Sequence, residues 1–203
     1  MPQLIRQPAA FALYVIVASV TPGPNNLMLV NVGIVRGSLS AVRTGLGVSC
    51  GWAIQILACA LGIGAAVRAV PGLSGVIEVA GLAYLVWLAV RLLGSRELGK
   101  ASPMHGFAGA IGYQWVNPKA VTMSLTTAGI FVVTTGGHAW LSALAVAVAA
   151  ALLNLPCVLL WGLGGARLST LLQEEAAVVR FHRIAAGALF AMVAWLVVVR
   201  VVG

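Results

Sequence analysis

The chain has 203 residues, of which 61% are hydrophobic and only 8% are charged, and its mean hydropathy is +1.05. About a quarter of the residues in an ordinary soluble domain are charged, and disordered chains are poor in hydrophobic residues, so this composition excludes both classes and indicates a polytopic membrane protein. The net charge of +8 comes from Lys and Arg residues scattered between apolar segments. That distribution is typical of membrane topology signals and argues against a nucleic-acid partner.

Six apolar stretches are long enough to cross a bilayer as helices, which takes about 20 residues. In chain order they are residues 9–34, 44–66, 73–93, 106–133, 139–161 and 184–202. The first is not expected to be a cleaved signal peptide, because no A-x-A site follows it and its apolar pattern continues. The connection 166–183 has leucines at helical spacing, which predicts a short helix lying at the interface. The chain is thus predicted to be one all-α transmembrane domain over residues 1–203.

The distribution of Lys and Arg predicts how these segments are oriented. The loops after odd-numbered segments contain eight such residues and the opposite side contains three. The eight are Arg36, Arg43, Arg91, Arg96, Lys100, Arg167, Arg180 and Arg183. Because basic loops stay in the cytoplasm, both termini are predicted to lie outside it, in a multi-pass protein of a bacterial inner membrane.

The first segment is interrupted at its centre by the sequence TPGPNN. Proline lacks a backbone N–H and clashes with the carbonyl four residues earlier, so two prolines here break the helix. Inside a membrane, irregular backbone survives only where protein covers it or where it lines a polar cavity, so the break indicates a binding site. The residues of this break are Thr21, Pro22, Gly23, Pro24, Asn25 and Asn26.

The fourth segment is broken in the same way by Asn117 and Pro118. Asn117 lies about 16 Å along the helix from the start of its segment, hence near the middle of the bilayer. Pro118 lies 96 positions after Pro22, close to half the chain length. Three segments make up each half, so the second half enters from the opposite side. The sequence therefore predicts six helices in two inverted repeats, about 9–93 and 106–202, with the breaks facing each other near the midplane.

Each break presents two chemically different groups. The half-helix after the break begins with free N–H groups that attract anions, and Gly23–Pro24 and Asn117–Pro118 suit its N-cap and first position. The half-helix before the break ends in freed carbonyls, which suit an ammonium group. A zwitterion such as an amino acid fits this pair of poles.

Lys119 is the single residue that most strongly indicates function. A cation at membrane depth costs about 2.5–3.5 kcal/mol on insertion scales, and Lys119 also follows a helix N-terminus, where the dipole disfavours it. One interpretation is that its ammonium binds or gates a substrate carboxylate. The alternative is that it snorkels to the interface or bonds carbonyls inside the bundle.

Other polar residues near the breaks are candidate substrate ligands. They are Thr21, Asn25 and Asn26 at the first break and Gln114 and Asn117 at the second. For each, satisfying the freed backbone groups is an equally good role. Gln55 and Asn154 are weaker candidates, for which interhelical hydrogen bonding is the favoured role. The pairs Gly33/Gly37 and Gly47/Gly51 have the GxxxG spacing that lets membrane helices approach closely.

Three motifs resemble the LysE/RhtB family of amino-acid exporters: TPGPN at 21–25, GLAYLVWLA at 81–89 and NPKA at 117–120. The resemblance covers nearly the whole chain, and the first motif is the most specific. It implies a secondary transporter that exports amino acids or close derivatives from the bacterial cytoplasm, driven by an ion gradient, usually of protons. The fourth segment, with Phe107, Gln114 and Asn117, resembles the cysteine/O-acetylserine exporter branch of the family.

The acidic residues depart from what proton coupling normally uses. Proton relays in transporters rely on carboxylates or histidines inside the membrane, yet the chain has no aspartate and only four acidic residues. Glu78 alone could approach the membrane, and we expect it at the interface near the outer end of its segment. Proton coupling is therefore implied by the resemblance and not by these residues.

Rival functions need residues that the sequence does not bring together. A thiol–disulfide carrier would need a cysteine beside each break, but the cysteines lie in the second and fifth segments. A metal exporter would need clustered ligands, but the histidines lie in three separate loops. These residues are Cys50, Cys59, Cys157, His105, His138 and His182. An enzyme would need a nucleophile and base or a metal, and none is visible.

We therefore predict no metal, no cofactor and no enzymatic activity. A thiol-redox carrier and a non-transporting membrane scaffold are kept as alternatives to the exporter. The expected partners are a small-molecule substrate, an amino acid, and membrane lipid, and a homo-oligomer is left open.

Overall fold

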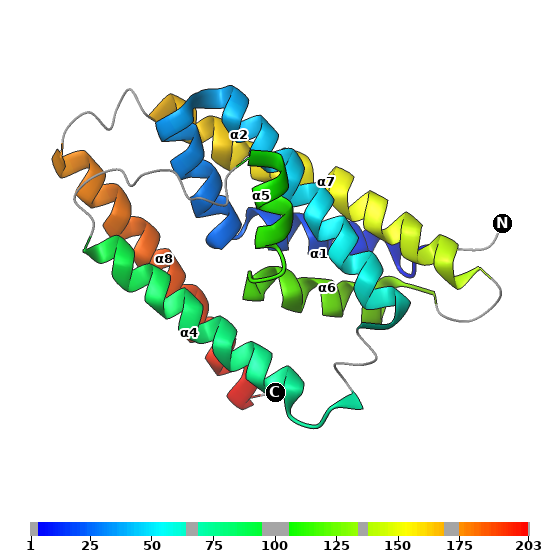
Figure 1. The fold of residues 1–203 in the computed structure, drawn as a ribbon. Helices are drawn as coiled ribbons and strands as arrows, with labels where there is room; N and C mark the ends of the chain where they lie inside the picture. The colour runs from blue at the N-terminus through cyan, green and yellow to red at the C-terminus, as the bar shows by residue number, and fades with distance from the viewer. Residues whose placement is uncertain (1–3, 64–68, 95–105, 134–137, 169–174, 203) are drawn as a thin grey trace.

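The computed structural model describes residues 4–63, 69–94, 106–133, 138–168 and 175–202, and Figure 1 shows their arrangement. Within these ranges the regular elements are all helices, and the one β contact is an isolated bridge between Ile5 and Val132. In chain order the elements are α1 (Pro8–Val20), α2 (Pro24–Ala58), the π-helical turn η1 (Cys59–Ile63), α4 (Leu73–Leu93), α5 (Gly106–Tyr113), α6 (Pro118–Phe131), α7 (Ala139–Leu168) and α8 (Glu175–Val202). The expected all-α class is confirmed.

Both predicted helix breaks are present. The chain leaves the helix after Val20 and resumes it at Pro24, with Gly23 extended at the N-cap. It leaves the helix again after Tyr113 and resumes it at Pro118. In both places a proline occupies the first helical turn, where its missing N–H has no intrahelical partner to lose.

Helix α2 reverses direction at Gly37, whose φ of 78° and ψ of 179° are open essentially only to glycine. Figure 1 shows the two arms of α2, one rising to the reversal and one descending from it. The second arm therefore begins at residue 38 rather than at the predicted residue 44. The prediction placed the start after Arg43, but a single exposed arginine marks a polar environment and does not end a helix.

The last two helices also differ from the predicted boundaries. α7 continues to Leu168 and α8 begins at Glu175, so residues 166–168 and 175–183 belong to these two helices. The separate interfacial helix predicted for 166–183 is therefore wrong, and residues 169–174 lie outside the described residues. The reason is the same as at Arg43: charged residues mark the membrane boundary, whereas neither Gly nor Pro interrupts the start of α8. α4 has the predicted bounds.

Glycines let α2 pack closely on its neighbours. Gly165 of α7 lies so close to Val30 that an added Cβ would be 2.3 Å from the Val30 carbonyl oxygen, and Gly33 is equally close to α7. Gly47 and Gly51 bring the second arm of α2 against α5. The predicted packing role of Gly47/Gly51 is confirmed, whereas Gly37 serves the reversal instead.

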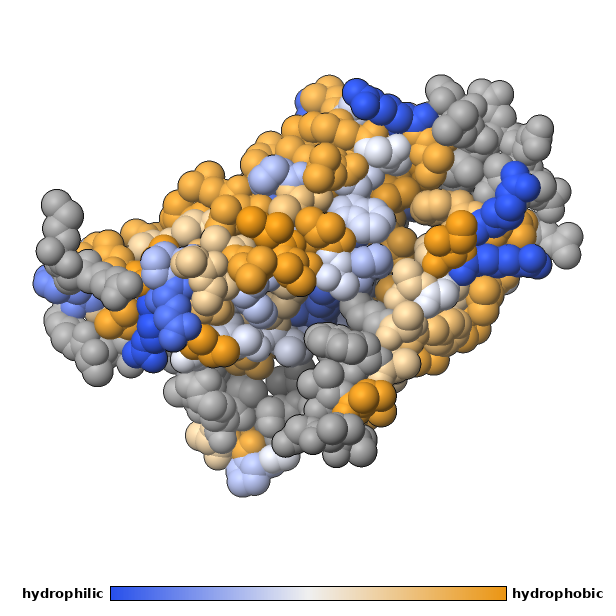
Figure 2. All heavy atoms as spheres, turned by 180° about the vertical axis from the view of Figure 1, so that it is seen from behind, coloured by the Kyte–Doolittle hydropathy of each residue, from blue (hydrophilic) through white to orange (hydrophobic). Residues whose placement is uncertain are grey.

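Much of the described surface is apolar. Figure 2 shows hydrophobic residues over most of the visible face, with hydrophilic residues in a few groups. Helices α2 with η1 (Pro24–Gly62) and α7 (Ala139–Leu168) are, among the described residues, long and apolar enough to cross a membrane by length and composition. The shorter Pro8–Val20 is also apolar. This surface fits a protein whose solvent is lipid.

Candidate functional site

The two helix breaks meet through an amide cluster. The side chain of Asn25, in the first turn after the first break, exchanges two hydrogen bonds with Gln114: Asn25 Nδ2 donates to Gln114 Oε1 at 2.9 Å, and Gln114 Nε2 donates to Asn25 Oδ1 at 3.2 Å. Asn117 Nδ2 also donates to Asn25 Oδ1, at 2.9 Å. Gln114 and Asn117 are almost fully buried. These hydrogen bonds join segments that are about 90 positions apart in the chain. Because the side chains are buried, each of their polar groups needs a hydrogen-bond partner.

Lys119 also joins the two breaks, because it follows the second break in the chain and its side chain bonds to the first. Its Nζ donates to the carbonyl oxygen of Thr21 at 2.8 Å and reaches that of Pro22 at 3.5 Å. The side chain lies against Gly23, where an added Cβ would be 2.9 Å from Lys119 Cδ. The cation therefore lies at the carbonyl end of α1, where the helix dipole favours it, although its own helix does not.

Side chains of the protein already occupy the carbonyls that the first break frees. Asn26 Nδ2 donates to the oxygens of Ser19 and Thr21, at 3.0 and 2.9 Å. The hydroxyl of Thr21 bonds back to Val17. Asn26 is 3% exposed, so this pairing holds the break together in a nearly dry environment.

The start of α6 is capped as the sequence predicts. Asn117 Oδ1 accepts from the backbone N–H of Lys119 at 3.1 Å, the usual bond of an N-cap residue. At the first break Gly23 has no side chain to cap α2, and its carbonyl accepts from Leu27 N–H at 3.0 Å. The first turn of α2 therefore keeps more backbone N–H groups without a side-chain acceptor than that of α6.

Two further polar chains tie this centre to the surrounding helices. Gln55 of α2 donates to the carbonyl of Gln114 and accepts from Ser124 of α6. Asn154 of α7 donates to Ser19 Oγ and accepts from Ser49 Oγ, both at 2.8 Å. The interhelical role predicted for Gln55 and Asn154 is thereby confirmed.

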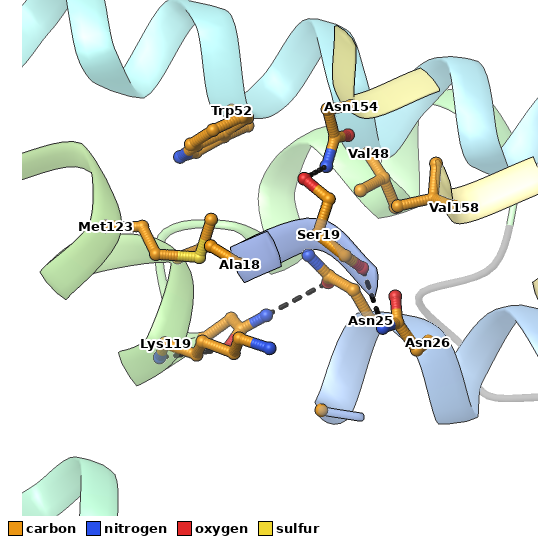
Figure 3. A pocket seen from close by; sticks show the side chains of 13 residues that line it. Ala18, Ser19, Asn25, Asn26, Val48, Trp52, Lys119, Met123, Asn154 and Val158 are labelled. Carbon is orange, nitrogen blue, oxygen red and sulfur yellow. Dashed lines mark hydrogen bonds between the residues drawn. The ribbon is translucent and has the colours of Figure 1, made fainter. Parts of the chain in front are cut away.

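A small cavity of about 20 Å³, open on one side, lies beside the two breaks. Of the predicted site residues, Gly23, Asn25, Asn26, Asn117 and Lys119 line it. Thr21 and Gln114 do not line it, but bond to residues that do. Figure 3 shows the side chains around this space.

Apart from Asn154, which the sequence marked as a weaker candidate, the rest of the lining comes from residues that the sequence did not single out. Polar Ser19 and Asn154 face the cavity together with Trp52 and Met123, and Figure 3 shows Asn154 pointing at Ser19. Ser19 precedes the first break by two positions, a signal that could have marked it. Trp52 comes from the middle of α2, where the sequence offers no such signal.

The charge of this cavity comes from one residue. Among the described residues that line it, Lys119 is the only ionisable one, and none carries a carboxylate. The indole nitrogen of Trp52, which is 2% exposed, has no hydrogen-bond partner among the described residues. An ammonium group and an unpaired N–H donor suit an anionic group such as a carboxylate.

The rival chemistries gain no support from the part of the chain that the structure describes. Cys50 is exposed, Cys59 and Cys157 are buried, and none of the three lines the cavity. No group of three or more His, Cys, Asp or Glu side chains comes together among the described residues. His105 and the side chain of Glu78 lie outside the described residues.

Comparison with known proteins assigns the chain to a family. Residues 16–200 match the family described as LysE type translocator. The chain is 30% identical over 128 residues to the cysteine/O-acetylserine efflux protein of Salmonella typhimurium and 32% identical over 127 residues to that of Escherichia coli O157:H7. Each alignment covers 61% of this chain and 65% of the relative, so the chain matches just under two thirds of these relatives' length. No solved structure matches. The protein belongs to the LysE type translocator family.

Proposed function

We propose that this protein is a secondary transporter that exports a small amino acid or a close derivative from the cytoplasm. The observation that carries the proposal is the meeting of two broken helices at one cavity, where the ammonium of Lys119 is the one charge among the described lining residues. Its membership in the translocator family and the names of its relatives, cysteine/O-acetylserine efflux proteins, favour the same substrate class.

The proposed architecture is six spans in two inverted repeats. In such a repeat the second arm of α2 corresponds to α7, and α4 corresponds to α8. These are the pairs that pack on each other, and the two breaks form the third pair. In Figure 1 the reversal of α2 and the end of α7 lie at one end of the molecule, and the start of α7 lies at the opposite end. In an inverted repeat, corresponding helices of the two halves are expected to pair around a binding site near the midplane of the membrane.

The proposed substrate pose uses both poles of a zwitterion. The carboxylate binds the ammonium of Lys119 and accepts from the indole N–H of Trp52. The substrate ammonium faces the amide and hydroxyl oxygens of Asn26, Asn154 and Ser19, which line the same cavity. These groups are already paired in part within the protein, so binding exchanges hydrogen bonds rather than filling empty sites.

We propose that the proton gradient drives export, as the family resemblance implies. None of the described residues that line the cavity carries a carboxylate, so the proposal of proton coupling is supported by the family resemblance rather than by these residues. An uncoupler added to energised cells should stop export if protons drive it. An export rate that follows a sodium gradient instead would contradict this part of the proposal.

Efflux from loaded cells is the direct test of the function. Cells expressing the protein are loaded with a panel of amino acids that includes cysteine and O-acetylserine, and external accumulation is measured against Lys119→Ala. We expect one small substrate class to accumulate, and its accumulation to fall about 10- to 100-fold in the variant, since a hydrogen bond to a charged group contributes about 1.5–3 kcal/mol.

The control is Arg183→Ala, which removes an exposed cation from α8, away from the cavity-lining residues. Both variants must be present in the membrane at wild-type level. Equal accumulation with and without well-expressed protein, across the whole panel, would contradict amino-acid export and favour a scaffold. Redox-dependent alkylation of Cys50 and Cys157 would instead favour the thiol carrier.

A further inference from the structure

A second space is lined by residues that adjoin lining residues of the central cavity in the chain: Val20 follows Ser19, and Cys157 precedes Val158. It is an open, apolar groove of about 450 Å³ between the α1–α2 break and helices α7 and α8. Val20 and Val30 form one wall and Phe181 of α8 borders it. The floor is a stripe of α7 formed by Cys157, Leu160, Trp161, Gly164, Gly165 and Leu168. None of these described lining residues is charged.

The stripe has the length of one membrane leaflet. Its residues recur at intervals of three and four along α7, so they share one helix face. From Cys157 to Leu168 the helix rises about 16 Å at 1.5 Å per residue. Half of a hydrocarbon core of about 30 Å is nearly the same length. The length of the groove therefore matches the length of one extended acyl chain in a membrane leaflet.

Arginines gather at one end of this groove. Arg167 precedes Leu168 in the last turn of α7, and Arg180 precedes Phe181 in α8; both are exposed. Arg36, also exposed, lies at the reversal of α2, where that helix packs against the end of α7. Basic side chains beside an apolar groove on the cytoplasmic side of a membrane protein are suited to anionic phospholipid headgroups.

We propose that this groove binds one anionic glycerophospholipid, with an acyl chain along the α7 stripe and the phosphate held by the arginines at the Leu168 end. The inference does not rest on the proposed transport function, because lipid binding is measured by itself. It has a structural consequence: Val20 adjoins Ser19, and Cys157 adjoins Val158, so the bound chain supports the outer side of two walls of the central cavity.

The test uses two glycines that both have room for a side chain. An added Cβ at Gly164, in the groove, or at Gly187, on α8, meets no atom within 4 Å. Gly164→Leu therefore begins from a Cβ that fits and extends a side chain into the groove, and Gly187→Leu is the matched control outside it. The full chain in detergent is mixed with phosphatidylglycerol or phosphatidylcholine, and bound lipid is counted by native mass spectrometry.

We expect wild type and Gly187→Leu to retain one phosphatidylglycerol and to bind phosphatidylcholine much more weakly. Gly164→Leu should lose that lipid. Arg167→Gln and Arg180→Gln should each weaken retention about fivefold, because one basic residue near an anionic lipid contributes roughly 1 kcal/mol. Should Gly164→Leu fail to fold, Leu160→Trp fills the same groove from a side chain that is already 70% exposed.

Three results would overturn the proposal. The first is equal retention of phosphatidylcholine and phosphatidylglycerol, which would remove the role of the arginines. The second is unchanged retention in both groove-filling variants. The third is a dimer, free of lipid, that dissociates in Gly164→Leu, because the groove would then be an interface between two copies of the chain.

Discussion

The side-chain nitrogen of Lys119 lies 2.8 Å from the carbonyl oxygen of Thr21, so the cation of one helix break is bound to the carbonyl end of the other. This contact gives Lys119 a structural role as well as a proposed role in binding substrate. Both roles use the same ammonium group. Substitutions that keep the hydrogen bond to Thr21 but change the charge distinguish the structural role from the binding role.

The first prediction concerns Lys119→Gln and Lys119→Arg. Glutamine keeps a donor for the carbonyls but removes the charge, so we expect a folded protein whose efflux falls about 10- to 100-fold. Arginine keeps the charge and should retain part of the activity. Lys119→Ala should also lose about 0.5–1.5 kcal/mol of unfolding free energy, a modest loss because Asn26 still donates to the Thr21 oxygen. Wild-type efflux by Lys119→Gln would show that the charge is not needed.

The second prediction concerns the coupling between the breaks. A double-mutant cycle of Asn25→Ala and Asn117→Ala should give a coupling energy of about 0.6 kcal/mol and at most about 1.7 kcal/mol, the range for hydrogen bonds between membrane helices. Unfolding in detergent measures it. The control pairs Asn25→Ala with Asn154→Ala, which bonds to Ser19 and Ser49 instead, and should be additive. Additivity in the Asn25 and Asn117 cycle would contradict a structural link.

The third prediction compares two adjacent glycines of α7. An added Cβ at Gly165 would be 2.3 Å from the carbonyl oxygen of Val30, whereas one at Gly164 meets nothing within 4 Å. Gly165→Ala should therefore lower the free energy of unfolding by about 1–3 kcal/mol, because backbone must move. Gly164→Ala should be neutral or stabilising by up to about 1 kcal/mol. Thermal unfolding of the two variants side by side decides it, and equal stability would mean that the close contact does not exist.

The fourth prediction concerns the reversal of α2. Gly37 has a positive φ with an extended ψ, so both Gly37→Ala and Gly37→Asn should lower stability by about 1–3 kcal/mol. Asparagine gives no relief, because it tolerates the left-handed helical region and not this one. Gly129→Ala in α6, where an added Cβ meets nothing within 4 Å, is the control and should keep or raise stability. A stable Gly37→Ala would indicate a continuous α2.

The fifth prediction concerns orientation in the membrane. In a chain with its three cysteines replaced by alanine, Ser38→Cys lies at the reversal of α2 and His138→Cys precedes α7; both positions are exposed. A membrane-impermeant maleimide should label position 138 in intact cells and label position 38 only after lysis, because basic loops stay in the cytoplasm. The reverse pattern would place both termini in the cytoplasm.

Local rules were sufficient for part of this structure. The positions of both helix breaks follow from proline chemistry, and Asn117 caps α6 because its short polar side chain reaches the N–H of Lys119, the first N–H of a helix that begins with proline. Close packing at Gly47 and Gly51 also follows from spacing. Helix ends were predicted less well: the start of the second arm of α2 and the bounds of α7 and α8 were set at charges, which mark where lipid ends and not where a helix does.

The sequence by itself determined the class of the protein, the two breaks, and the residues that flank them, because composition and proline act over a few positions. Only the tertiary structure decided which groups those residues meet. The carbonyls of the first break accept hydrogen bonds from Asn26 and Lys119. Thr21 and Gln114 do not line the cavity, whereas Trp52 and Met123 do. Such contacts join positions far apart in the chain, 98 residues for Lys119 and Thr21 and 135 for Asn154 and Ser19. They depend on how the helices pack against one another, and the local sequence of one helix does not determine the positions of its neighbours.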